Sequence, residues 1–209
     1  MNNINSVSVF SGEAHRKVQG RIGGAKKVSL HVNLQIGDFQ LEAQLQAYEN
    51  IGLVHYRPSK VDPKKKPNPH LDIWLEHLAL QLADWPGPRT SYLIGEDGSW
   101  MFPEIQGEVG AKDLLAKLLG IYWQGLRQPL PFFPKTSLTY AADGTDNALE
   151  KALNAWEGVP DSDYQQGERE DPYFRLCFAS YPKPLDEQFE VLAKQVFAPL
   201  LDNHKKEQE

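Results

Sequence analysis

The chain has 209 residues, of which 41% are hydrophobic and 24% are charged, a composition that is ordinary for a globular protein with one full hydrophobic core. Its one cysteine, Cys177, excludes an internal disulfide and any four-cysteine metal site built from this chain alone, and the lack of a signal-peptide core or of an apolar run near ~20 residues predicts a cytoplasmic protein without a membrane span. The net charge of −6 combines a basic first part, with ten Lys and Arg against five Asp and Glu over residues 1–66, and an acidic remainder, with twelve against twenty-three.

The first predicted elements form a β-meander. Apolar residues alternate with polar ones over 28–36 and again over 39–47, which is the period of strands with one buried and one wet face. Gly37-Asp38 predicts a two-residue hairpin turn between them, and Glu49-Asn50 predicts a second turn before a third strand over 51–57.

A Pro-rich, basic segment that reads RPSKVDPKKKPNP over 57–69 then predicts an extended loop. We expect Asn68 to cap the following helix and Pro69 to occupy its first position, and WPGP at 85–88 to stop it. The next predicted element is a strand over 90–95, with a turn from Glu96 to Ser99.

The rest of the chain is predicted to be helical, over 110–127, 147–157, 171–180 and from 185 onward, with an irregular segment at 128–146. Pro199 is expected to kink or end the last helix. Cys177 is interpreted as a core thiol and the tryptophans as packing residues, with Trp100 as the one that a turn could expose. This order indicates an α/β (α+β) fold, in which a three-strand antiparallel meander, a helix and a strand carry a helical C-terminal annex.

A meander followed by a helix and a strand is also the core order of the PD-(D/E)xK nucleases. These enzymes need a carboxylate on the second strand and a (D/E)-x-K sequence on the third. Residues i and i+2 of a strand point to one face, so the acid can bind a divalent metal while the lysine steadies the attacking water.

This chain lacks those groups. The third strand offers His55-Tyr56-Arg57, and the second strand offers the amides Gln44 and Gln46. Magnesium demands oxygen ligands, so we interpret Gln44, Gln46, His55 and Arg57 as degenerate positions and expect no metal, no catalytic residue and no nuclease activity of this domain. If the four side chains converge on one pocket and no metal is present, the degenerate-nuclease interpretation stands; if they are scattered, only the family resemblance supports it.

Other catalytic motifs are missing as well. The sequence contains no HExxH zinc motif, no Walker loop and no GxSxG nucleophile elbow. We therefore expect no cofactor.

The loop after the third strand is the candidate DNA-binding site. Lysine and arginine neutralise phosphates, which supply most of the affinity for a duplex. The residues concerned are Arg57, Lys60, Lys64, Lys65 and Lys66. A solvated basic loop is the competing interpretation. The turn at Glu96 to Trp100 is a candidate projection toward DNA or another subunit.

Segments along most of the chain resemble one family, the C-terminal domain of the gamma subunit of exodeoxyribonuclease V, which is the RecC subunit of the RecBCD helicase–nuclease. They are GLVHYRPSK at 52–60, IWLEHLALQLA at 73–83, EDGSWMFP at 96–103, the stretch ending in PLPFFP at 125–134, LEKALNAWEG at 149–158, DPYFRL at 171–176 and FAPLL at 197–201. We expect a poorly matched lead-in at 1–26, a nuclease-like domain of the gamma subunit over 27–201 and a charged tail at 202–209.

The resemblance implies a nuclease-like fold without nuclease residues, inside a DNA helicase and exonuclease complex of double-strand-break repair and recombination. In that complex the gamma subunit binds the beta and alpha subunits, helps to split the duplex and guides the separated strands. The domain alone is then no enzyme but a scaffold and DNA guide, although the parent complex is an ATP-dependent exodeoxyribonuclease. The chain is expected to be a fragment of the longer subunit.

Two alternatives stay open. One is an active metal-dependent nuclease with a rearranged site, in which Glu42 or Glu49 supplies the missing carboxylate. The other is a pure protein-binding adaptor that never touches DNA.

Overall fold

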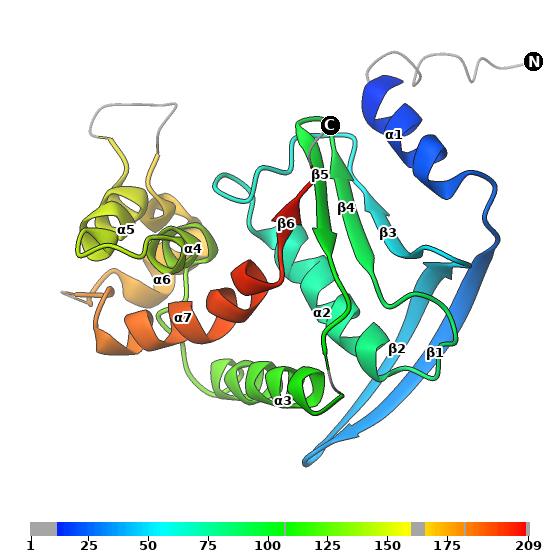
Figure 1. Ribbon diagram of the computed structural model, residues 1–209. Helices are drawn as coiled ribbons and strands as arrows, with labels where there is room; N and C mark the ends of the chain where they lie inside the picture. The colour runs from blue at the N-terminus through cyan, green and yellow to red at the C-terminus, as the bar shows by residue number, and fades with distance from the viewer. Residues whose placement is uncertain (1–11, 107, 160–165, 182, 208–209) are drawn as a thin grey trace, which may run out of the picture. The chain divides into compact units, whose positions relative to one another are not determined.

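The computed structural model describes residues 12–106, 108–159, 166–181 and 183–207, which form two compact units (Figure 1). We call residues 1–116 with 203–209 the sheet unit, and residues 117–202 the helical unit. The sheet unit contains α1 (Gly12–Ile22), β1 (Lys27–Ile36), β2 (Phe39–Tyr48), β3 (Gly52–Tyr56), α2 (Asn68–Leu82), β4 (Ser91–Gly95), β5 (Gly98–Phe102) and β6 (Lys205–Lys206). α3 (Glu108–Gly125) runs from the sheet unit into the helical unit, which contains α4 (Pro134–Ala142), α5 (Ala148–Glu157), the 3-10 helix η1 (Glu168–Glu170), α6 (Pro172–Phe178) and α7 (Glu187–Asp202).

The six strands lie in the sheet in chain order, so the predicted mixed α/β class and the meander are confirmed. All neighbours are antiparallel except β3 and β4, which are parallel and are connected through α2. Ile36 pairs with Phe39 across the predicted two-residue turn. Gly37 has a φ of +57° there, a conformation that side chains with a Cβ rarely adopt.

α2 and α1 cover opposite faces of the sheet (Figure 1). Leu80 of α2 is fully buried in a cluster with Leu45 and Leu53 of the meander, and His77 of α2 hydrogen-bonds Ser91 of β4. Tyr92 follows Ser91 and therefore points to the other face, because successive strand residues alternate. On that face the guanidinium of Arg21, from α1, lies 3.8 Å from the centroid of the Tyr92 ring.

The predicted cap of α2 is wrong. The helix begins at Asn68 itself, and no side chain caps it. The main-chain carbonyl of Pro67 accepts hydrogen bonds from the amides of His70 and Leu71 instead. At the other end Arg89 donates to the carbonyls of Leu80, Gln81 and Ala83, at 2.6 to 3.0 Å, so a side chain from beyond the helix satisfies its last carbonyls.

The expectation that the turn exposes Trp100 is also wrong. The turn consists of Glu96 and Asp97, since β5 already begins at Gly98, and Trp100 is only 3% exposed. The C-terminal segment covers it: the ring of His204 stacks on Trp100, and β6 pairs with β5. The exposed tryptophan is Trp123 of α3, with 52% of its surface accessible.

The helical unit is built around Phe133, whose ring contacts Trp156, Phe174, Phe178 and Phe189. Part of the segment predicted to be irregular, 128–146, forms α4, which begins with Pro134 in its first turn. Pro199 lies inside α7, which continues to Asp202, so the proline does not end this helix. Cys177 is exposed and is not a core thiol, because α6 turns Phe178 inward and the neighbouring position outward. No described helix is long and apolar enough to cross a membrane.

Candidate nucleic-acid interface

The four degenerate positions do not share a pocket. On β2, Leu45 and Ala47 face α2, so Gln44 and Gln46 point to the opposite face, where both amides donate to the hydroxyl of Ser29 at 2.9 Å. His55 and Arg57 point toward α2, because they share the parity of Leu53. The two amides and the pair His55 and Arg57 therefore lie on opposite faces of the sheet, and these four side chains cannot surround one metal ion.

His55 and Arg57 are instead bonded to acidic residues of α2. His55 Nε2 lies 2.9 Å from Glu76 Oε2, and Arg57 Nη2 lies 3.1 Å from Asp72 Oδ2. Two neighbouring positions on one face of β3 thus bind two acids that lie one turn apart on α2. Neither acid was expected from the sequence. Their helical spacing was visible, but only the packing of α2 on β3 tells which strand positions they meet.

The carboxylates of the rearranged-site alternative lie elsewhere. Glu42 is on the face of β2 opposite to His55 and accepts a hydrogen bond from Gln40 at 3.1 Å. Glu49 follows β2 and lies 3.7 Å from Lys26 Nζ. Within the described part of the chain, no three His, Cys, Asp or Glu side chains gather as they would around a metal ion.

The basic loop, which we define as residues 57–67, is fixed onto the β4–β5 turn. The carboxylate of Asp97 accepts hydrogen bonds from the amides of Val61 and Asp62, at 2.7 and 3.0 Å. The amide of Glu96 donates to the Ser59 carbonyl at 3.1 Å, and Val61 is fully buried. Asp97 therefore holds the loop in place on this turn.

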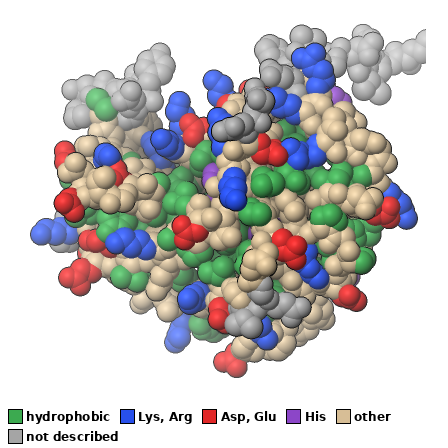
Figure 2. All heavy atoms as spheres, viewed as in Figure 1, with side chains coloured by type: hydrophobic (Ala, Val, Ile, Leu, Met, Phe, Trp, Pro, Cys, Tyr) green, Lys and Arg blue, Asp and Glu red, His purple; other side chains and the backbone are tan. Residues whose placement is uncertain are grey.

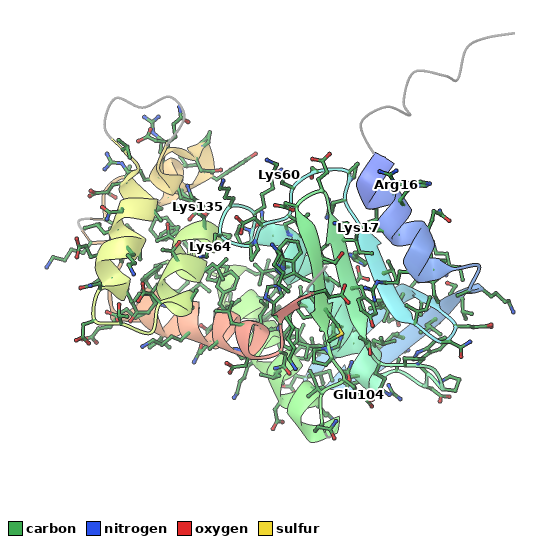
Figure 3. The ribbon with its side chains drawn as sticks, turned by 45° about the horizontal axis from the view of Figure 1, so that its top comes forward. Arg16, Lys17, Lys60, Lys64, Glu104 and Lys135 are labelled. Atoms are coloured by element: carbon green, nitrogen blue, oxygen red, sulfur yellow. The ribbon has the colours of Figure 1, made fainter. Side chains whose placement is uncertain are left out.

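The four lysines of the loop, Lys60, Lys64, Lys65 and Lys66, are exposed and form no ion pair with a described residue. Arg57 differs, because Asp72 neutralises it. Figure 3 shows Lys60 and Lys64 on this loop, apart from the basic residues Arg16 and Lys17 of α1. On the face drawn in Figure 2, basic and acidic side chains are mixed.

The buried His70 of α2 forms a hydrogen bond with the main chain of the basic loop. His70 Nε2 lies 2.6 Å from the carbonyl oxygen of Val61, and His70 Nδ1 lies 3.0 Å from Nε2 of His204. A carbonyl only accepts, so the proton of His70 is on Nε2, its Nδ1 accepts, and His204 donates from Nε2. Burial lowers the pKa of His70 and lowers the pKa of His204 to about 3, so both rings are neutral at pH 7. They are structural groups that bond the loop to the C-terminal segment.

Comparison with known proteins agrees with the resemblance seen in the sequence. A family model described as the RecC C-terminal domain matches residues 6–145, which is more than half of the chain and includes the basic loop, β3 and α2. A search of curated proteins finds no match. The chain therefore belongs to the RecC C-terminal domain family, and with it to the DNA repair and recombination machinery of exodeoxyribonuclease V, whose gamma subunit is RecC.

Proposed function

We propose that this domain is a non-catalytic, nuclease-fold part of a RecBCD-type helicase–exonuclease complex and serves there as a subunit scaffold and DNA guide. The basic loop carries the proposal. Its four unpaired lysines sit on an anchored loop that directly follows β3, the strand on which a PD-(D/E)xK enzyme would carry its catalytic residues. Lysines in such a loop contact phosphates and position a strand without reading its sequence.

The sheet supports the nuclease-fold part of the proposal. The meander, α2 and β4 follow one another in the order that these enzymes use, with β3 and β4 parallel. His55 and Arg57 are engaged with Glu76 and Asp72, so these positions bond a strand to a helix rather than facing a substrate.

The helical unit supports the scaffold part. It exposes large apolar side chains, among them Tyr173 at 79% and Leu176 at 83% on α6. Leu149 and Leu153 of α5 line a cavity of ≈ 630 Å³ together with Tyr181. Exposed apolar surface of this kind marks a site where another protein binds, and the beta and alpha subunits are the partners we propose.

Binding of a fluorescently labelled DNA fork, measured by anisotropy at several salt concentrations, tests the DNA-guiding role. We expect weak, salt-sensitive binding by the chain, and a loss of about tenfold or more at low salt on combined reversal of Lys64, Lys65 and Lys66 to Glu. The matched control reverses Lys112, Lys117 and Arg127, three exposed cations outside the loop, with the same change in net charge. Equal affinities of the loop variant and the wild type would remove the basic loop from the proposal.

Two further measurements address the alternatives. A titration with Mg²⁺ or Mn²⁺ on single- and double-stranded substrates should yield no cleavage, and clean cleavage that disappears in Glu42→Gln would establish an active nuclease instead. Crosslinking in the assembled complex separates a DNA guide from a pure adaptor, since an adaptor would be crosslinked to protein subunits and never to DNA.

A further inference from the structure

We infer that the phosphate-binding surface extends beyond the basic loop onto the C-terminal strand β6, where Lys206 binds the backbone of the same DNA. This inference rests on the proposed function, because it assigns a further contact to the same surface. Lys206 was not part of the site expected from the sequence, and it lies beyond the part of the chain that the family model matches.

The C-terminal segment is fixed on the sheet. Lys205 and Lys206 pair with Met101 and Trp100 of β5, and the amide of Glu207 donates to the Ser99 carbonyl at 2.9 Å. Arg21 Nη2 lies 2.7 and 2.6 Å from the two carboxylate oxygens of Glu207. The two lysines are therefore held in place and do not belong to a free tail.

Two separate sets of contacts bring this segment to the basic loop. First, His70 is hydrogen-bonded to the Val61 carbonyl and to the His204 ring. Val61 directly follows Lys60 of the loop, and His204 directly precedes β6. Second, the side chain of Lys206 passes over Gly98, where an added Cβ would lie 2.9 Å from its Cε. Gly98 follows Asp97, the residue that anchors the loop. Figure 1 shows β6 beside β5, at the edge of the sheet.

The charges on this surface favour an anion. Lys206 points to the face of Trp100, on which His70 of α2 lies, and its ammonium lies 5.3 Å from the centroid of the Trp100 ring, a contact that leaves it free to bind a phosphate. Lys205 points to the opposite face, where Glu207 binds Arg21, because successive strand residues alternate. Of the neighbouring acids, Glu207 is paired with Arg21, whereas Asp62 and Asp97 accept backbone amides of the loop and keep their negative charge. With the exposed Glu96 they oppose the lysines, but the four lysines of the loop and Lys206 outnumber these three acids.

Edge lysines have a second established use, because a charge on an edge strand prevents pairing with other chains. Charge reversal separates the two roles. Glutamate protects an edge as well as lysine does, but it repels a phosphate.

The test compares Lys206→Glu with the wild type, with the loop variant and with Lys205→Glu, a matched reversal on the other face of the same strand, each as the full chain. We expect the magnitude of the slope of log Kobs against log salt concentration for the DNA fork to fall by about 0.7 to 0.9 in Lys206→Glu, because each phosphate contact contributes about 0.7 on single strands and 0.9 on duplex. Lys205→Glu should keep the slope of the wild type. Circular dichroism establishes that each variant is folded, and Lys206→Gln replaces Lys206→Glu if the latter does not fold.

Each outcome decides one question. If the loop variant loses affinity while Lys206→Glu keeps both the affinity and the slope of the wild type, Lys206 only protects the edge, and the inference is wrong while the proposed function stands. If reversal of the loop changes nothing, the proposed DNA-guiding role fails, and the extended surface fails with it.

Discussion

His70 and His204 are separated by 134 positions in the chain, yet their ring nitrogens Nδ1 and Nε2 lie 3.0 Å apart. His70 also holds the Val61 carbonyl, so the start of α2, the basic loop and the C-terminal segment meet at these two rings. His70 must be neutral to make this pattern, since a second proton on it would remove the acceptor that His204 needs. The stability of the sheet unit is therefore coupled to pH.

Acidification should destabilise the protein well before its carboxylates titrate. Burial lowers the pKa of His77 to about 4, and burial together with the nearby His70 lowers that of His204 to about 3. The unfolded chain takes up these protons as the pH falls through 6.5, whereas the folded chain does so only near the lowered values, so stability present above pH 6.5 is lost progressively down to about pH 4. Fully buried His77 alone should cost about 2 kcal/mol at pH 5. Urea denaturation at pH 7.5 and pH 5 measures the loss; equal midpoints would contradict it.

Asp97→Ala should release the basic loop. The substitution leaves the amides of Val61 and Asp62 without their acceptor, at a cost on the order of 2 kcal/mol. Trypsin should then cleave faster within residues 60–66, as followed by mass spectrometry, whereas Asp38→Ala in the β1–β2 turn should leave the cleavage rate unchanged. A loop that resists trypsin equally in both variants would mean that Asp97 does not anchor it.

Gly52→Ala should be severely destabilising. Gly52 has a φ of +102°, and an added Cβ would lie 2.0 Å from the Thr90 carbonyl oxygen, so both the backbone conformation and the approach of β3 to that loop are incompatible with a side chain. We expect a loss of about 3 kcal/mol or more. Gly120→Ala is the control: nothing lies within 4 Å of its Cβ position inside α3, and this variant should gain about 0.5–1 kcal/mol. Thermal unfolding of the two variants gives the comparison.

Asp72→Asn should strengthen DNA binding. The carboxylate of Asp72 neutralises Arg57, and both side chains are about half exposed, so the lost ion pair should change stability by less than about 1 kcal/mol. Freed Arg57 should raise the affinity for the DNA fork by roughly twofold to fivefold. The control is Asp113→Asn on α3, which also removes one negative charge but at a position outside the loop. If it raises the affinity equally, the effect comes from net charge and not from Arg57.

The sequence by itself determined the elements whose signals are local. The alternation over 28–36 and 39–47, with Gly37-Asp38 between them, specifies a hairpin because strand period and turn chemistry act over a few residues, and α5 and α6 follow from the same kind of local pattern. It could also be recognised without a structure that His55 and Arg57 stand where a nuclease would have an acid and a lysine, and that the chain resembles the RecC family.

Only the tertiary structure decided where those residues point and what they meet. The two amides and the pair His55 and Arg57 lie on opposite faces, because the register of β2 and β3 fixes which parity faces α2. Trp100 is buried, and the side chain of Lys206 lies over Gly98, beside the residue that anchors the loop, because a segment about a hundred residues later returns to β5. Such contacts depend on chain packing over long sequence separations, which no local pattern encodes. They separate the four positions that the sequence suggested as one degenerate pocket, and they hold the basic loop in place.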